Sequence, residues 1–222
     1  MQKTKVVTTE DVLTMFCSSV VKVLTSATQL RLGYSPMIQK INRTCLRPDI
    51  GCFVLFDGGF SGLVVVNFSA AAALEIYQTY LRNMGLPQDE ISTQHTSDDV
   101  GNVLGELMNQ IVGDFIGSIG KKMMVSLKQN QPKMLTITKE VMISIDTNLD
   151  RPQMRRVSFN TAGGNVFYME LAMDKTEFVK LHDFEFEDFE PDQLLEQNQP
   201  TEGTATRETD TTHSDLMDEL GI

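Results

Sequence analysis

Apolar residues recur with a helical period in three segments of the chain, each preceded by a Ser or Thr that is suited to cap a helix. The clearest segment begins after Ser97 and keeps the i, i+3, i+4, i+7 spacing for about five turns. Asp98 and Asp99 add acidic residues to its first turn, where the helix dipole favours them. The predicted helices run from Thr8 or Thr9 to about Leu30 (ended by Gly33 and Pro36), from Ser69 to about Met84, and from Ser97 to about Gly120.

Between and after these segments the apolar residues alternate with polar ones, as in strands. Strands are predicted at residues 51–56, 62–68, 135–138, 141–145, 154–159 and 166–173. Asp57-Gly58-Gly59 and the Gly-rich segment 160–165 are typical of hairpin turns. Gly58-Gly59 lacks the motif context of a phosphate-binding loop, so a hairpin is favoured. The predicted fold class is α+β, an antiparallel sheet covered by long amphipathic helices.

Charge divides the chain into two parts. The net charge is −11, but residues 183–222 hold 13 acidic residues and a single basic one, so residues 1–182 are nearly neutral. We therefore expect one domain at 1–182 and an acidic, largely disordered tail at 183–222, with a linker at 193–214. The last eight residues are either a frayed terminus or a docking peptide, and their apolar-acidic pattern leaves both interpretations open.

Composition excludes several classes of function. The neutral body argues against a nucleic-acid-binding domain, and no apolar run is long enough to span a membrane. The first residues lack a secretory signal, so we expect a cytoplasmic protein. Cys17, Cys45 and Cys52 lack metal-ligand spacing, and a metal site is not expected. Neither a nucleophile–His pair nor a cofactor motif points to a small-molecule enzyme.

The side of the third predicted helix that faces away from its apolar stripe is unusual. It carries amides, one carboxylate and glycines instead of the usual Lys, Arg and Gln. One interpretation is that Gly105 and Gly113 let another helix of the protein cross closely, and that Glu106 and Asn109 are ordinary surface residues. The combination instead favours a partner site, because two polar groups one turn apart lie beside positions without bulk. The positions on this side are Asn102, Glu106, Asn109, Gly113 and Gly120.

Residues 104–113 resemble the active-site helix of the CheC/CheX phosphatases of bacterial chemotaxis. Glu106 and Asn109 match the Glu-x-x-Asn pair of that family, and Pro132 follows Asn109 at the family's spacing, with 22 residues between them. Asn102 departs from the pattern, which has an acid or Ser four residues before the Glu. The first predicted helix has no Glu-x-x-Asn, so a single site is expected, as in CheX.

The resemblance implies that the chain hydrolyses the phospho-aspartate of a CheY-like receiver domain. Asn109 is then expected to place the attacking water and Glu106 to accept a hydrogen bond from a receiver Lys. Asn102, Gly105 and Gly113 are expected to contact the partner, and Pro132 to have a structural role. The chain itself binds no cofactor, because the receiver brings its own divalent metal, Mg²⁺.

The same resemblance implies a homodimer. Strands 154–159 and 166–173 are apolar enough that we expect them to leave a sheet edge or face in need of cover. The alternative function is a non-catalytic module that binds a receiver domain or a flagellar or signalling partner without hydrolysis. Asn102 and the long tail favour that alternative.

Overall fold

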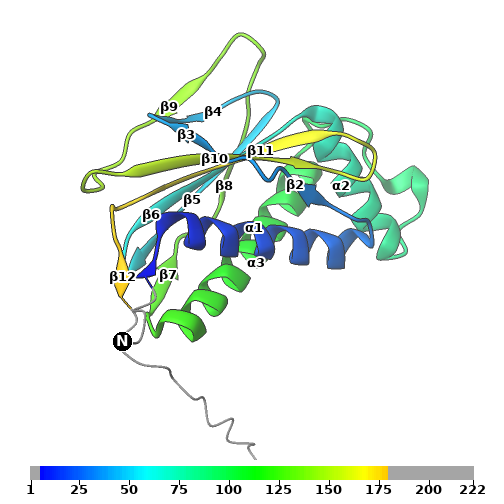
Figure 1. The fold of residues 1–222 in the computed structure, drawn as a ribbon. Helices are drawn as coiled ribbons and strands as arrows, with labels where there is room; N and C mark the ends of the chain where they lie inside the picture. Colours follow the sequence, from blue (N-terminus) through cyan, green and yellow to red (C-terminus); the bar gives the residue numbers. More distant parts are fainter. Residues whose placement is uncertain (1–5, 180–222) are drawn as a thin grey trace, which may run out of the picture. The chain divides into compact units, whose positions relative to one another are not determined.

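The computed structural model describes residues 6–179, in which three α-helices pack on one face of an antiparallel sheet (Figure 1). The predicted α+β class is therefore confirmed. The predicted tail at 183–222 and its boundary lie outside the described residues and stay predictions. The helices are α1 (Thr9–Thr28), α2 (Ala70–Asn83) and α3 (Asp98–Met123), and a short 3-10 helix, η1 (Gln88–Glu90), precedes α3.

All three helices begin at the caps that the sequence predicts. Thr8 and Asp11 form a reciprocal capping box at α1, and the hydroxyls of Ser69 and Ser97 accept hydrogen bonds from the first turns of α2 and α3. The end of α1 differs slightly from the prediction. It stops at Thr28, because Gln29 adopts a left-handed conformation with φ of 56° and caps the helix before Gly33 and Pro36 are reached.

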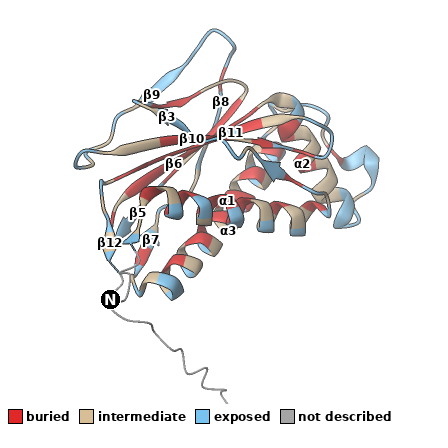
Figure 2. Ribbon diagram, viewed as in Figure 1, coloured by how far each residue is buried: buried red, intermediate tan, exposed pale blue. Residues whose placement is uncertain are grey.

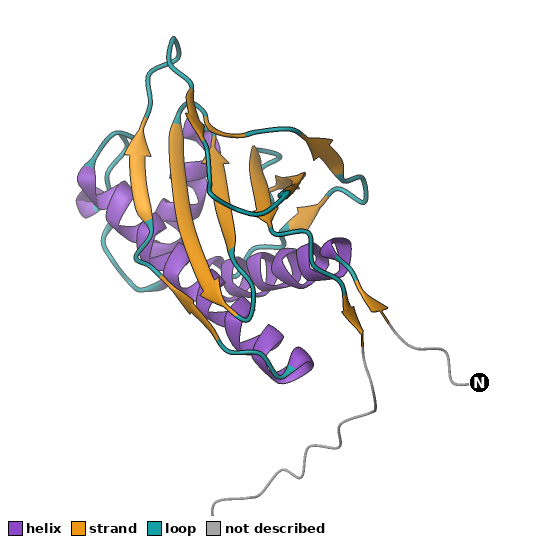
Figure 3. Cartoon of the chain, turned by 90° about the vertical axis from the view of Figure 1, so that its left-hand side faces the viewer, coloured by secondary structure: helices purple, strands orange, loops and turns teal. Residues whose placement is uncertain are grey.

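The main sheet has eight strands in the order β2-β10-β11-β6-β5-β7, with β3 also beside β10 and β8 also beside β5. Figure 3 shows strands in front of the helices. Its strands are β2 (Gly33–Tyr34), β3 (Gln39–Ile41), β5 (Ile50–Gly58), β6 (Gly62–Phe68), β7 (Leu127–Gln129), β8 (Lys133–Thr136), β10 (Gln153–Asn160) and β11 (Val166–Met173). Two further pairs form separate two-stranded sheets: β1 (Val6–Val7) with β12 (Phe178–Val179), and β4 (Thr44–Leu46) with β9 (Ile143–Ile145).

Both predicted hairpins, β5–β6 and β10–β11, are present. At the first turn, Gly58 has φ of +146°, and a Cβ there would lie 2.2 Å from the carbonyl oxygen of Ser126. Only glycine fits that position. The strand predicted at 135–138 is displaced to Lys133–Thr136, and the one predicted at 141–145 is shortened to Ile143–Ile145.

The main core lies between the helices and the sheet, where the buried positions of both meet (Figure 2). Phe16 of α1 and Phe115 of α3 are in ring contact there, with centroids 4.6 Å apart. A smaller core lies on the other face of the sheet, under β4 and β9. It consists of Leu46, Leu63, Val65, Ile137 and Ala172.

Strand β4 is fixed over that second face by buried polar groups. Glu170 of β11 is fully buried, and its carboxylate accepts hydrogen bonds from the Arg156 guanidinium (2.9 Å from Nε) and from the backbone N–H of Cys45 (2.8 Å). The side chain of Asn67 also donates to the carbonyl oxygen of Cys45. These contacts satisfy a carboxylate that would be costly to bury alone.

The expectation that β10 and β11 leave an edge uncovered is wrong. β11 lies between β10 and β6, and the outer edge of β10 pairs with β2 and β3. On the second face β4 and β9 cover part of the sheet, whereas Tyr168 of β11 stays exposed. These covering strands have two or three residues each, too few to show an alternating pattern in the sequence. The homodimer stays a prediction that this observation does not support.

Candidate functional site

The polar side of α3 is fixed outward by the burial of the opposite side. Glu106, Asn102 and Gly113 are exposed, and Asn109 is half-buried. The predicted orientation of this helix is therefore confirmed. The buried residues that set it are Val100, Leu104, Leu107, Met108, Ile111, Val112, Phe115 and Ile119.

The carboxylate of Glu106 and the amide of Asn109 differ in what holds them. Glu106 accepts a hydrogen bond from the side-chain amide of Gln110, one turn along the same helix, at 3.1 Å. Asn109 is held from another element, because Nε2 of Gln129 in β7 donates to its Oδ1 at 3.1 Å. The carboxylate thus stays at the surface, whereas the amide is anchored to the sheet.

An open groove of about 470 Å³ runs beside this face of α3. Four of the six predicted site residues line it: Asn102, Gly105, Asn109 and Pro132. Glu106 and Gly113 do not line the groove. The other lining residues are Ile50, Thr96, Ser97, Asp98, Gly101, Gln131, Met134, Leu135 and Thr136.

Pro132 directly precedes β8, which forms the wall of the groove opposite α3. A proline suits the position before a strand, since it fixes φ and favours extended backbone around it. Pro132 therefore lies at the entry to β8, and its structural role stays a prediction.

The glycines of α3 differ in what surrounds them. A Cβ added at Gly105 would lie 3.4 Å from the Met134 side chain, an ordinary contact, whereas one added at Gly113 would meet nothing within 4 Å. The interpretation that Gly113 lets another helix of the protein cross closely is therefore wrong. Gly105 faces a side chain of β8 rather than a helix.

One charged group near the site, the carboxylate of Asp114, links α3 to α1. Asp114 of α3 accepts a hydrogen bond from Ser19 of α1 at 2.7 Å and forms an ion pair with Lys22. Burial opposes ionisation of Asp114, but the contacts from Lys22 and Ser19 outweigh it and lower the pKa of the carboxyl. Among residues 6–179, no three His, Cys, Asp or Glu side chains gather closely enough to hold a metal ion.

The sequence did not reveal Gln129 as part of the site. It lies on a three-residue strand that was not predicted, and its partner Asn109 is 20 residues away. One signal was available: Leu127 and Gln129 share a side of an extended segment, so a polar residue interrupts an inward-facing pattern.

The chain matches, over residues 3–222, the model of a family described as "Protein of unknown function (DUF3334)". The chain belongs to this family. No curated protein matches this DUF3334 protein. Within residues 6–179 it has no helix with both the length and the apolar character needed to cross a bilayer.

Solved structures show the fold of the DUF3334 protein. It resembles a CheX protein of Desulfovibrio desulfuricans (TM-score 0.59, 19% identity), covering 74% of this chain and 99% of that one. It also resembles a CheC-like superfamily protein of Shewanella sp. PV-4 (TM-score 0.60, 17% identity, 74% and 97%). A third is a CheX–CheY–BeF₃–Mg²⁺ complex from Borrelia burgdorferi (TM-score 0.55, 15% identity, 74% and 98%). The predicted CheC/CheX-like fold is confirmed.

Proposed function

We propose that this protein is a CheX-like phosphatase that hydrolyses the phospho-aspartate of a CheY-like receiver domain in chemotaxis or another two-component pathway. The observation that carries the proposal is the pairing of Glu106 and Asn109. They lie one turn apart on the outward side of α3, in the fold of CheC- and CheX-like proteins.

Asn109 has the chemistry that the proposed reaction requires. An acyl phosphate is already activated, so hydrolysis needs mainly a water held in line with the phosphorus. The carboxamide oxygen of Asn109 accepts a hydrogen bond from that water and thereby orients it. An amide does not act as a base, and this reaction does not demand one.

Glu106 orients the complex. Its exposed carboxylate accepts a charge-assisted hydrogen bond from a receiver Lys, and its contact with Gln110 leaves the second oxygen for this purpose. Gly105 and Gly113 let the receiver approach the helix backbone, and Asn102 adds a polar contact within the groove. The receiver brings Mg²⁺, which neutralises the phosphoryl charge.

The partner is proposed from the fold. One solved structure of this fold contains CheX with CheY, BeF₃ and Mg²⁺. That composition supports a CheY-like receiver as the partner of the present chain. A homodimer of this chain belongs to the same proposal, and light scattering at micromolar concentration checks it: a monomer only would contradict it.

The test is the decay of phosphorylated receivers of the same cell, with and without the full chain. We expect acceleration for at least one receiver, and no acceleration by the Asn109→Ala variant. If the chain accelerates the decay of none of them, it is not a receiver phosphatase.

Binding without hydrolysis is the second candidate function. Asn102, which lines the groove, stands where the family pattern has an acid or Ser. A module that only binds is expected to retain a receiver treated with beryllium fluoride and Mg²⁺ without changing the decay of the phosphorylated form. That pair of results would favour the second function over the first.

A further inference from the structure

Gln129 reaches from β7 to the one amide on which the proposed reaction depends. Its Nε2 lies 3.1 Å from Oδ1 of Asn109 and 3.5 Å from the backbone oxygen of the same residue. The contact joins the sheet to α3 across 20 positions of sequence. Among residues 6–179, this is the hydrogen bond that orients the Asn109 side chain from outside its own helix.

The segment that carries Gln129 is held firmly. Gln129 pairs with Phe56 in the β5–β7 ladder. The next residue, Asn130, donates its backbone N–H to the carbonyl of Leu55 at 3.0 Å, and its side-chain Oδ1 accepts from the N–H of Leu55 at 2.9 Å. The position of the Gln129 backbone is therefore set by the sheet, independently of α3.

The second polar atom of the Gln129 carboxamide makes the residue costly to the fold. Its Oε1 is buried and has no hydrogen-bond partner among the described residues. An unsatisfied buried polar atom costs about 1–3 kcal/mol. Leu127, on the same side of β7, belongs to the apolar core, so an apolar residue at 129 would suit the fold better. A residue that costs stability is expected to bring an advantage elsewhere. For Gln129 that advantage is the contact with Asn109.

We propose that Gln129 is a positioning residue for Asn109, an inference that rests on the proposed function. The terminal torsion of an Asn side chain is broad, so the carboxamide of a half-exposed Asn rotates easily. Donation from Gln129 fixes its plane and occupies one of the two acceptor directions of Oδ1. The other direction is then the one left for the attacking water.

The test compares Gln129→Leu with the matched variant Lys128→Leu, whose exposed side chain lies on the other side of β7. Loss of orientation acts on the transition state and not on docking. For Gln129→Leu we expect a fall of roughly tenfold in the maximal rate at saturating phospho-receiver, an unchanged affinity for the receiver, and a melting temperature equal to or above that of the parent. Lys128→Leu is expected to keep the parental rate.

A second variant separates the effect of the Gln129 N–H donor from the effect of the shape of its side chain. Gln129→Glu keeps the length of the side chain and removes the N–H donor, so it turns the Asn109 carboxamide around. We expect the same loss of rate with retained binding. If Gln129→Leu lowers affinity and melting temperature together with the rate, Gln129 is a structural residue and the proposal is wrong.

A measurement that does not depend on enzymatic activity keeps this proposal distinct from the proposed function. In the parent, ¹⁵N relaxation of the Asn109 side-chain amide is expected to report an ordered group, and in Gln129→Leu a mobile one. Equal order in both proteins overturns the positioning role. If the parent accelerates no receiver, the phosphatase proposal fails, and the relaxation measurement still decides whether Gln129 orients Asn109.

Discussion

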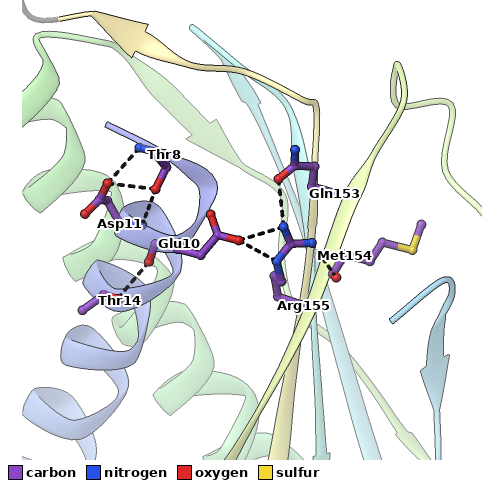
Figure 4. A network of polar contacts seen from close by, with 7 residues as sticks. All are labelled: Thr8, Glu10, Asp11, Thr14, Gln153, Met154 and Arg155. Atoms are coloured by element: carbon purple, nitrogen blue, oxygen red, sulfur yellow. Dashed lines mark hydrogen bonds and ion pairs between the residues drawn. The ribbon is translucent and has the colours of Figure 1, made fainter. Parts of the chain in front are cut away.

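The two long helices of the main core, α1 and α3, bury similar stripes against each other and against the same sheet, yet they use their polar residues in opposite ways. On α1 several polar side chains bond to the protein itself. Figure 4 shows Glu10 accepting two hydrogen bonds from Arg155 of β10, at 2.8 and 2.9 Å, and Thr14 donating to the carbonyl of Glu10. Ser18 likewise donates to the carbonyl of Thr14.

On the outward side of α3 the polar side chains do not use all of their hydrogen-bonding capacity within the protein. The contacts of Glu106 and Asn109 each use one oxygen, and Gly113 has open space in front of it. Helical glycine costs stability, so this side of α3 is not optimised for the fold. The contrast indicates that a polar helix face is available for function where the fold does not use all of its hydrogen-bonding groups.

The largest effect that this contrast predicts is the loss of rate in Asn109→Ala. Removing a group that acts only in the transition state is expected to slow hydrolysis by about a hundredfold or more while receiver binding is retained. Thr14→Ala, on the polar side of α1, is the control and should keep the parental rate. Phospho-receiver decay and a binding titration measure both; hydrolysis by Asn109→Ala at the parental rate means that the site is misassigned.

The features that the sequence predicted are those with a local cause. The caps at Thr8, Ser69 and Ser97 and the apolar stripe of α3 set the helices, and the exposed side of α3 followed from that stripe. What was missed depends on pairing across the chain. Strand β4 is defined by Glu170 and by its pairing with β9, about 100 residues away. Gln129 reaches Asn109 only because β7 meets α3.

The anchoring of α1 predicts the next largest effect. Arg155 is nearly buried and donates to Glu10, to Gln153 and to the carbonyl of Met154. Arg155→Met should lower the free energy of unfolding by about 2 kcal/mol, because it removes several charge-assisted hydrogen bonds. The phosphatase rate at saturating receiver should not change.

Lys22→Met supplies the comparison for Arg155→Met. The side chain of Lys22 is 71% exposed, and its ion pair with Asp114 is worth at most about 1 kcal/mol. Denaturant unfolding measures both variants. Equal effects of the two substitutions would contradict the view that the Arg155 network anchors α1.

A smaller effect of opposite sign is expected on α3. Gly113→Ala adds a methyl group to open space within a helix, so it should raise the free energy of unfolding by about 0.5–1 kcal/mol. The same methyl group should hinder the receiver and lower its affinity.

Gly117 is also open and lies one turn further from Glu106 and Asn109. Gly117→Ala should bring the same stabilisation with a smaller loss of affinity, whereas unchanged affinity in Gly113→Ala would remove this residue from the contact surface.

The smallest effect is a pH dependence of stability at the start of α1. The hydrogen bonds from Arg155 hold the pKa of Glu10 below its ordinary value of 4.5, against the opposing effect of burial. A carboxyl whose pKa is lowered by folding stabilises the fold above the unfolded pKa, and this contribution is lost as the pH falls through the folded pKa.

The difference in unfolding free energy between the parent and Glu10→Gln, called the gap below, should therefore be full at pH 7 and shrink below pH 4.5. Since the Glu10 side chain is 45% exposed, the gap should stay below about 1 kcal/mol. In an Arg155→Met background the same substitution should show a much smaller pH dependence, because only the backbone of α1 and the charge of Lys40 then lower the pKa of Glu10. An undiminished gap there would mean that Arg155 is not the main group that holds the Glu10 carboxylate.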